Sequence, residues 1–344
     1  MRTSLIDRTA YRAQQLSFLT GSTLLQETAR ALSRRRRPPL SADTLTRLRR
    51  RYFRLLQRDL DNVASGMYPR ELLFNLPIAS YMRSLPSLIR DAPRVVRRMR
   101  SKNYKDLPAH VDLDRERYPA YYRRTFHWQT DGYFSKRSAA MYDVGVELLF
   151  GGTADVMRRQ IIPPITRFLA GRDPREVKLL DIACGTGRPL NQLAVAHPDV
   201  RYHGVDLSPY YVRLARERLA RVREMTLMAE NGESLPFVDQ HFDVVTSVYL
   251  FHELPRNARR RVLADAYRVL RPGGLLVLQD SAQPFDSGEL EDALHNFPRD
   301  FHEPFYDDYL RDDLAAAATE SGFEVESVEA HLVAKVVVAR KPAH

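Results

Sequence analysis

From about residue 173 the sequence alternates short apolar segments with stretches of helical periodicity. This alternation predicts a parallel, doubly wound α/β sheet, because each parallel connection needs a crossover and a helix supplies it. We expect helices over 190–196, 209–221 and 257–270, between five strands in VKLLDIAC, RYHGVDLS, MTLMAENG, FDVVTSVYLFH and GLLVLQDSA. Too few residues separate the last two apolar segments, EVESVEAH and AKVVVARK, for a crossover. The prediction is therefore a mostly parallel, seven-stranded sheet with an antiparallel C-terminal hairpin strand.

The charge is distributed unevenly along the chain. Residues 1–172 contain 33 Lys and Arg against 15 Asp and Glu, a net charge of +18, which leaves −8 of the total +10 for residues 173–344. A basic region of this kind is suited to nucleic acid, anionic lipid or an acidic substrate, and it is equally suited to pairing with the acidic part of its own chain. The composition leaves these alternatives open.

The N-terminal region has helical periodicity with interruptions. Segments 4–33 and 42–63 have apolar residues at helical spacing, whereas five prolines within 69–108 predict only short helices there. We expect those short helices to wrap around the rest of the protein, the alternative being a membrane surface. The chain is thus divided into a basic, mainly helical region over 1–150 and an α/β domain over 151–344.

The cysteine content and the apolar segments indicate the compartment. Cys184 is the one cysteine, so no internal disulfide forms, and the sequence has no ligand spacing of a zinc site. No signal peptide and no run of about 18 apolar residues is present. We expect a cytoplasmic protein with no metal, and peripheral association with an anionic membrane is the alternative to a fully soluble state.

The first predicted strand runs into a glycine-containing turn, DIACGTGRP. Ligands of open α/β sheets bind beyond the carboxyl ends of the strands, where glycines let the backbone approach them closely. Gly185 and Gly187 lie in this turn, and Asp206 ends the second strand, where a carboxylate can accept hydrogen bonds from a ribose. The third glycine of a dinucleotide motif is missing. The pattern therefore favours a nucleoside ligand over a pyrophosphate.

Five segments in this order resemble class I S-adenosylmethionine-dependent methyltransferases, particularly the ubiquinone and menaquinone biosynthesis type: LLDIACGTGR, GVDLSP, NGESLPFVDQHFDVV, LFHELP and AYRVLRPGGLLVLQD. The resemblance covers about residues 155–342 and implies a Rossmann-like fold with S-adenosylmethionine as cofactor. It also implies cofactor contacts from the methionine end through the ribose to the adenine, by Asp181, Ala183, Gly185, Gly187, Asp206, Leu207, Asn231 and Gly232.

Methyl transfer requires an aligned acceptor that is deprotonated where its atom is acidic, so a base is useful. His252 follows the fourth strand, where the family usually places residues facing the methyl group, and Asp280 follows the fifth. We take both as catalytic candidates, together with His127 and Asp131. Glu253 is interpreted as a first-turn residue of the next helix.

Two segments outside the core are expected to form the acceptor pocket. The aromatic-rich segment 118–142 predicts a lid over a small molecule, although a seam between domains would have the same composition. The second segment, 295–310, follows the fifth strand. The candidate substrate-binding residues from the two are Trp128, Gln129, Tyr133, Tyr142, His302 and Tyr306.

These features together predict methyl transfer to a small-molecule acceptor that is aromatic, quinone-like or lipid. Two other classes stay open. The basic N-terminal half could serve an RNA or protein methyltransferase, although the sequence has neither an N-P-P-Y motif nor a second cysteine. The third possibility is a non-catalytic protein that binds S-adenosylmethionine or takes part in an assembly.

Overall fold

The structure is a computed structural model that describes residues 4–33, 40–101, 103, 105, 107, 114, 116–300 and 302–343. Seven strands form one sheet in the order β3-β2-β1-β4-β5-β7-β6. All neighbours are parallel except β7, which is antiparallel to both β5 and β6. This confirms the predicted sheet. The strands are β1 (Lys178–Ile182), β2 (Arg201–Val205), β3 (Met225–Met228), β4 (Phe242–Val248), β5 (Leu270–Ser281), β6 (Glu324–His331) and β7 (Ala334–Arg340).

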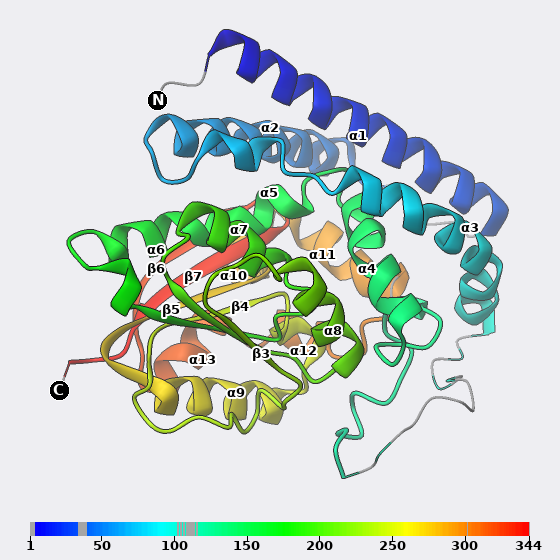
Figure 1. The fold of residues 1–344 in the computed structure, drawn as a ribbon. Helices are drawn as coiled ribbons and strands as arrows, with labels where there is room; N and C mark the ends of the chain where they lie inside the picture. The colour runs from blue at the N-terminus through cyan, green and yellow to red at the C-terminus, as the bar shows by residue number, and fades with distance from the viewer. Residues whose placement is uncertain are drawn as a thin grey trace.

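Helices cover both faces of the sheet, with α6 and α7 on one side and α9 and α13 on the other (Figure 1). Successive strand residues such as Leu179 and Leu180 are both buried, one in each of two hydrophobic clusters, because strand side chains alternate between faces. These helices are α5 (Ala154–Arg158), α6 (Ile162–Leu169), α7 (Arg188–Ala196), α8 (Pro209–Arg218), α9 (Arg256–Val269), α10 (Pro284–Ser287), α11 (Glu291–Asp300), α12 (Tyr306–Leu310) and α13 (Leu314–Glu320). Short 3-10 helices lie at Arg70–Leu73, Phe126–Trp128 (η2), Arg159–Ile161, Pro174–Glu176, Phe251–Glu253 (η5) and Gly288–Leu290.

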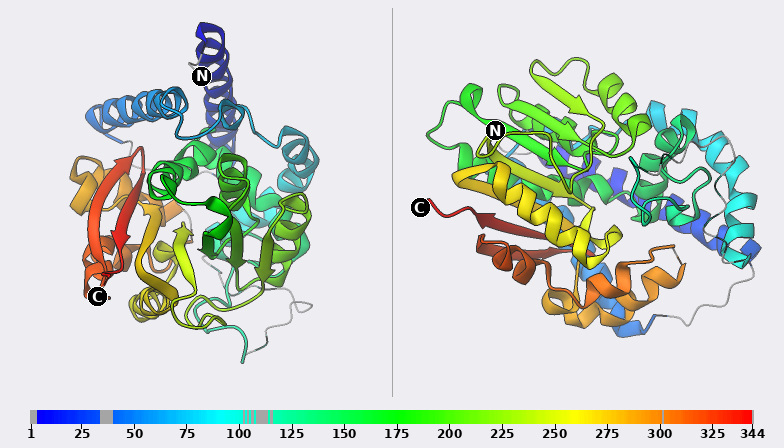
Figure 2. Two further views of the ribbon diagram at one scale, coloured as in Figure 1. Left: turned by 60° about the vertical axis from the view of Figure 1, so that its left-hand side comes forward. Right: turned by 90° about the horizontal axis from the view of Figure 1, so that it is seen from below.

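The N-terminal helices form an outer layer over one side of the α/β core (Figures 1 and 2). They are α1 (Leu5–Ser33), α2 (Ala42–Ala64), α3 (Ile78–Ser101) and α4 (Lys136–Leu149). Leu55 and Leu56 of α2 belong to the same hydrophobic cluster as Val156, Leu179 and α7. The helical region and the sheet therefore share one core. Arg51 of α2 also pairs with Glu289, so basic side chains of the first half meet acidic ones of the second.

A buried ion pair joins α2 to the start of the core. The Nε atom of Arg159 donates to Asp59 over 2.9 Å, and the hydroxyls of Tyr11 and Tyr68 donate to the same carboxylate. Asp59 is fully buried. A buried carboxylate is tolerated when its hydrogen-bonding capacity is satisfied. The cluster ties α1, α2 and the segment after α5 to one another.

The prediction of only short helices in the proline-rich segment is wrong, because α3 is a single 24-residue helix that contains Pro86 and Pro93. A proline inside a helix leaves the carbonyl four residues earlier without its donor. Those carbonyls belong to Met82 and Ile89, which are exposed, so water can bind them. Within the described part of the chain, no helix combines the length and the apolar character needed to cross a bilayer.

Candidate functional site

The turn between β1 and α7 has left-handed backbone at three positions. Ala183, Gly185 and Gly187 have φ angles of 60°, 55° and 77°. This conformation costs about 1–3 kcal/mol at a residue with a side chain such as Ala183, and such strain concentrates at functional sites. A Cβ added at Gly187 would lie 2.8 Å from Leu219, whereas one at Gly185 would enter open space. The turn is thus packed closely at one glycine and leaves room at the other.

A cleft opens beside this turn, at the carboxyl ends of β1, β2 and β4. Its empty volume, including the open mouth, is about 1010 Å³. The lining residues include Tyr121, Tyr122, Phe126, Tyr133, Tyr142, Tyr211, Asp143, Arg158, Ala183, Gly185, Thr186, Arg188, Asp206, Leu207, Asn231, Gly232, Tyr249 and Glu253.

Asp206 directly follows β2 and lines this cleft. Its carboxylate accepts hydrogen bonds from the backbone N–H groups of Gly185 at 3.0 Å and Ser208 at 2.8 Å. Loss of solvent in the cleft raises the pKa of Asp206 to about 6, against the opposing effect of the two backbone donors. The two donors fix the carboxylate at the cleft wall, where its remaining lone pairs can accept hydrogen bonds from a ligand.

Six of the predicted cofactor residues line the cleft: Ala183, Gly185, Asp206, Leu207, Asn231 and Gly232. Asp181, in β1, and Gly187, in the turn, are not among the residues that line the cleft. Asp181 is fully buried and accepts from Thr246 over 2.8 Å through one carboxylate oxygen, while its other oxygen has no hydrogen-bond partner in the described structure. Burial raises the pKa of Asp181 to about 7.

Charged side chains that sequence reasoning missed line the cleft next to Thr186. Asp143 accepts a 2.8 Å hydrogen bond from the Thr186 hydroxyl and pairs with Arg218. Arg158 is buried at the cleft wall and pairs with Asp155 over 2.9 Å. Asp143 lies on α4 and Arg158 on α5. Neither is part of the five segments that carry the family resemblance, so local sequence motifs gave no signal for them.

Aromatic rings from the segment before α4 form another wall of the cleft. The rings of Phe126 and Tyr133 are stacked with centroids 5.4 Å apart, and Tyr133 meets Tyr211 edge to face at 5.4 Å. The ring centroid of Tyr122 lies 5.6 Å from that of Tyr133. Tyr142 lines the same cleft from α4. Of the candidate substrate-binding residues, Tyr133 and Tyr142 thus line the cleft.

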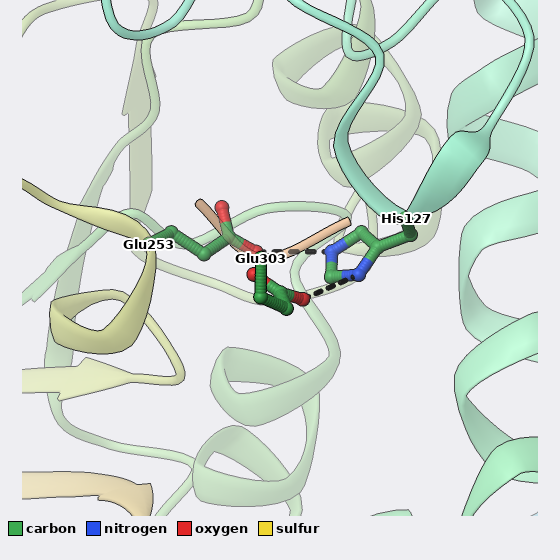
Figure 3. Close-up of side chains that lie close together, drawn as sticks. All are labelled: His127, Glu253 and Glu303. Carbon is green, nitrogen blue, oxygen red and sulfur yellow. Dashed lines mark hydrogen bonds and ion pairs between the residues drawn. The ribbon is translucent and has the colours of Figure 1, made fainter. Parts of the chain in front are cut away.

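His127 lies between two carboxylates beside this wall (Figure 3). Its Nδ1 atom is 2.7 Å from Glu303, and its Nε2 atom is 3.1 Å from Glu253, which also accepts a 2.7 Å hydrogen bond from Tyr133. Burial lowers the pKa of His127, but Glu303 and Glu253 outweigh it and raise the pKa to about 10. One ring nitrogen of His127 and one oxygen from each carboxylate, the atoms that could bind a metal ion, lie within 4.8 Å of one another. Because each ring nitrogen faces a carboxylate, the arrangement is that of an imidazolium between two anions.

His252 and Asp280 form a separate buried pair. Nδ1 of His252 is 2.6 Å from Asp280, which also accepts from the backbone N–H of Phe251 over 2.7 Å. Burial opposes protonation, but the Asp280 carboxylate raises the pKa of His252 to about 9. Neither residue is among those that line the cleft. Because η5 turns the chain after β4, the next residue, Glu253, occupies the position expected for His252 and is not part of the next helix, which begins at Arg256.

Four other sequence candidates, Gln129, Asp131, His302 and Tyr306, are not among the residues that line the cleft. Gln129 donates to the Ser138 carbonyl over 2.8 Å, and Asp131 is buried with a left-handed backbone. The carbonyl of His302 accepts from the His127 N–H at 3.3 Å. Tyr306 packs against His252 and is hydrogen-bonded to Ser281. The side chain of Trp128 lies outside the described residues.

Comparisons with known proteins identify the central segment. Residues 179–274 match the family model described as a methyltransferase domain. Demethylmenaquinone methyltransferase of Tropheryma whipplei (strain Twist) is 34% identical over 134 residues, 39% of this chain and 48% of that protein. The 27-O-demethylrifamycin SV methyltransferase of Amycolatopsis mediterranei (strain S699) is 33% identical over 171 residues, 48% of this chain and 61% of that protein. This chain thus covers less than two thirds of the length of either relative.

A solved structure of an S-adenosylmethionine-dependent methyltransferase from Methanosarcina mazei has a TM-score of 0.41 and 20% identity to this chain. The match covers 52% of this chain and 98% of that one.

Proposed function

We propose that this chain, whose residues 179–274 form a methyltransferase domain of the class I, S-adenosylmethionine-dependent type, methylates a small apolar acceptor. The observation that carries the proposal is one cleft that is lined both by a fixed carboxylate, Asp206, and by the aromatic wall. The domain implies S-adenosylmethionine as the cofactor. When bound, that cofactor supplies an electrophilic methyl group on its sulfonium.

The residues of the cleft fit this cofactor. A side chain at Gly185 would enter open space within the cleft, so its absence leaves a cradle for a ligand. Asp206 would accept hydrogen bonds from the ribose hydroxyls, and Asn231 with Gly232 would contact the adenine. The charged amino-acid end requires partners of both signs, and Arg158 with Asp143 offers them beyond Thr186.

The acceptor would enter along the aromatic wall. Tyr133 and Tyr142 offer apolar ring surface, and Glu253 offers a carboxylate that faces the same cleft. Glu253 would take the proton of an acidic acceptor, and His127 would stabilise the charge of that carboxylate. The names of the two relatives give demethylmenaquinone and 27-O-demethylrifamycin SV as the molecules that they methylate, both small. The aromatic wall supports an acceptor of this class.

Calorimetric titration with S-adenosylhomocysteine tests the cofactor assignment. Wild-type protein should bind it with micromolar affinity. Asp206→Ala should weaken binding by roughly ten- to a hundredfold, because a charge-assisted hydrogen bond is worth about 1.5–3 kcal/mol. Asp199→Ala, on an exposed turn, is the matched control and should bind as wild type does. No binding by the wild type would refute the cofactor, and unchanged binding by Asp206→Ala would refute the ribose contact.

Radiolabelled methyl transfer tests the acceptor class. Purified protein with methyl-labelled S-adenosylmethionine should label material that organic solvent extracts from a cell lysate. Glu253→Gln should lower this incorporation at least roughly tenfold, while affinity for S-adenosylhomocysteine stays within severalfold. Glu217→Gln, on the exposed face of α8, is the control. Label found only in RNA or protein would contradict a small-molecule acceptor.

A further inference from the structure

The exposed face of α3 carries an apolar stripe. Ile78, Met82 and Ile89 are 54%, 63% and 60% exposed, and the exposed Pro86 and Pro93 continue the same line along the helix. The spacing of four, four, three and four residues keeps these side chains on one side of an α-helix. Scattered exposed apolar residues need no explanation, whereas a continuous stripe indicates a binding surface.

Arginines flank this stripe on one side. Arg83, Arg90, Arg94 and Arg97 are exposed, and at helical spacing they follow the stripe along its length. The single acidic residue of α3, Asp91, points inward, where it is buried and accepts from Thr130 and Arg137. The outer face of α3 therefore combines apolar side chains with cations and carries no carboxylate of its own.

The position of α3 leaves this face accessible. The helix packs against α4 and lies on the outside of the molecule, away from the sheet (Figures 1 and 2). Its buried side is occupied by residues such as Tyr81, Ser84 and Arg98. The apolar stripe is thus presented outward along a helix whose other side is already packed.

We propose that α3 binds the surface of an anionic lipid bilayer, lying in the plane of the interface. Ile78, Met82 and Ile89 would enter the boundary between headgroups and acyl chains, and the arginines would reach the lipid phosphates. The phosphates of a nucleic acid would pair with the arginines, but a nucleic acid would leave the apolar stripe without an apolar partner. A second copy of this chain that paired through the same face would place arginines against arginines, because the single acidic residue of α3, Asp91, is buried and already paired. Anionic lipid satisfies both parts of the surface.

Vesicle flotation of the full chain tests this proposal without reference to methyl transfer, so its outcome is separate from that of the proposed function. At low salt the protein should float with vesicles that contain phosphatidylglycerol and remain unbound with vesicles of phosphatidylcholine alone. Arg83→Gln, Arg90→Gln and Arg97→Gln combined should lower the partition coefficient roughly a hundredfold. Ile78→Gln, Met82→Gln and Ile89→Gln combined should lower it roughly tenfold or more.

One triple and one double variant outside α3 provide matched controls. Arg213→Gln, Arg221→Gln and Arg223→Gln remove the same charge from exposed positions of the core, and Val238→Gln with Phe285→Gln removes exposed apolar side chains. Both should float as wild type does, and thermal melting checks that every variant is folded.

Three results would overturn the proposal. Failure of the wild type to float at low salt removes the lipid partner. If the glutamine variants of α3 float as well as the wild type does, the lipid contact is made by another part of the protein. A dimer in sedimentation velocity that the variants of α3 dissociate, in a protein that does not float, assigns the stripe to a second copy of the chain.

Discussion

His127 Nδ1 lies 2.7 Å from a carboxylate oxygen of Glu303, which joins the aromatic segment before α4 to the segment before α12. The Nε2 atom of the same ring faces Glu253 after β4. One imidazolium thus holds the aromatic wall against two other parts of the chain. The contact is expected to close the cleft on the acceptor side, and its strength depends on the protonation of His127.

The charge of His127 predicts a particular pH dependence of stability. Its pKa in the folded protein is about 10, above the value of about 6.5 in an unfolded chain. The stabilisation is therefore complete below about pH 6.5 and is lost as the pH rises toward about 10. His127→Gln should reduce the fall in melting temperature between those two values. His295→Gln, on α11, should leave the fall unchanged. Identical pH profiles for wild type and His127→Gln would contradict the ion-paired cluster.

Gly185→Ala should weaken cofactor binding beyond its effect on the backbone. The added methyl would enter the open space of the cleft at a residue whose φ is +55°. Gly171 is the matched control, because its φ is +78° and nothing lies within 4 Å of its added Cβ either, but it does not line the cleft. Both variants should lose about 1–2 kcal/mol in urea unfolding. Only Gly185→Ala should lose affinity for S-adenosylhomocysteine, and equal affinities in calorimetry would refute the cradle.

Asp59→Ala should destabilise the protein strongly. The substitution leaves the buried guanidinium of Arg159 without its carboxylate and removes the acceptor of two tyrosine hydroxyls. Loss of one partner from a buried pair costs about 3–5 kcal/mol. Equilibrium unfolding in guanidinium chloride would measure this loss of stability. Asp61→Ala, on the exposed side of α2, should cost less than about 1 kcal/mol. A similar small loss for both variants would show that the cluster does not hold α1 and α2 in place.

His252→Leu should lower stability and leave cofactor binding within severalfold. Asp280 keeps its backbone donors, from Phe251 and Ser281, but loses a charge-assisted contact worth about 1.5–3 kcal/mol. The ring of His252 does not line the cleft, so S-adenosylhomocysteine should bind with little change. Calorimetry and thermal melting on one protein sample separate the two effects. A large loss of affinity with unchanged stability would show that His252 contacts the cofactor, which would contradict its place outside the cleft.

The sheet and the position of the Asp206 carboxylate at the cleft could be predicted because both depend on local sequence. Strand segments show continuous apolar character, and Asp206 follows its strand directly, so the end of the strand determines its position. Which residue after β4 lines the cleft, His252 or Glu253, could not be predicted in the same way. One step along η5 separates His252 from Glu253, and the direction of that turn depends on the contact of Asp280 with Phe251.

The proline-rich segment shows a different limit. Pro86 and Pro93 argue against a long helix when only the local backbone is considered. The helix forms because the carbonyls that lose their donors are on the exposed side, while Tyr81 and Ser84 pack on the other. Arg158 and Asp143 were likewise missed, since their place at the cleft depends on how α4 and α5 pack against the sheet.

The contacts of α2 impose an order on biosynthesis. Arg51 donates to the carbonyl of Leu332, and Arg58 pairs with Glu329, both in the hairpin of β6 and β7. A ribosome releases α2 long before it makes that hairpin, so Arg51 and Arg58 lack these partners until nearly the whole chain has been translated. Nascent chains halted before β6 should therefore be more susceptible to protease within α2 than chains released after β7.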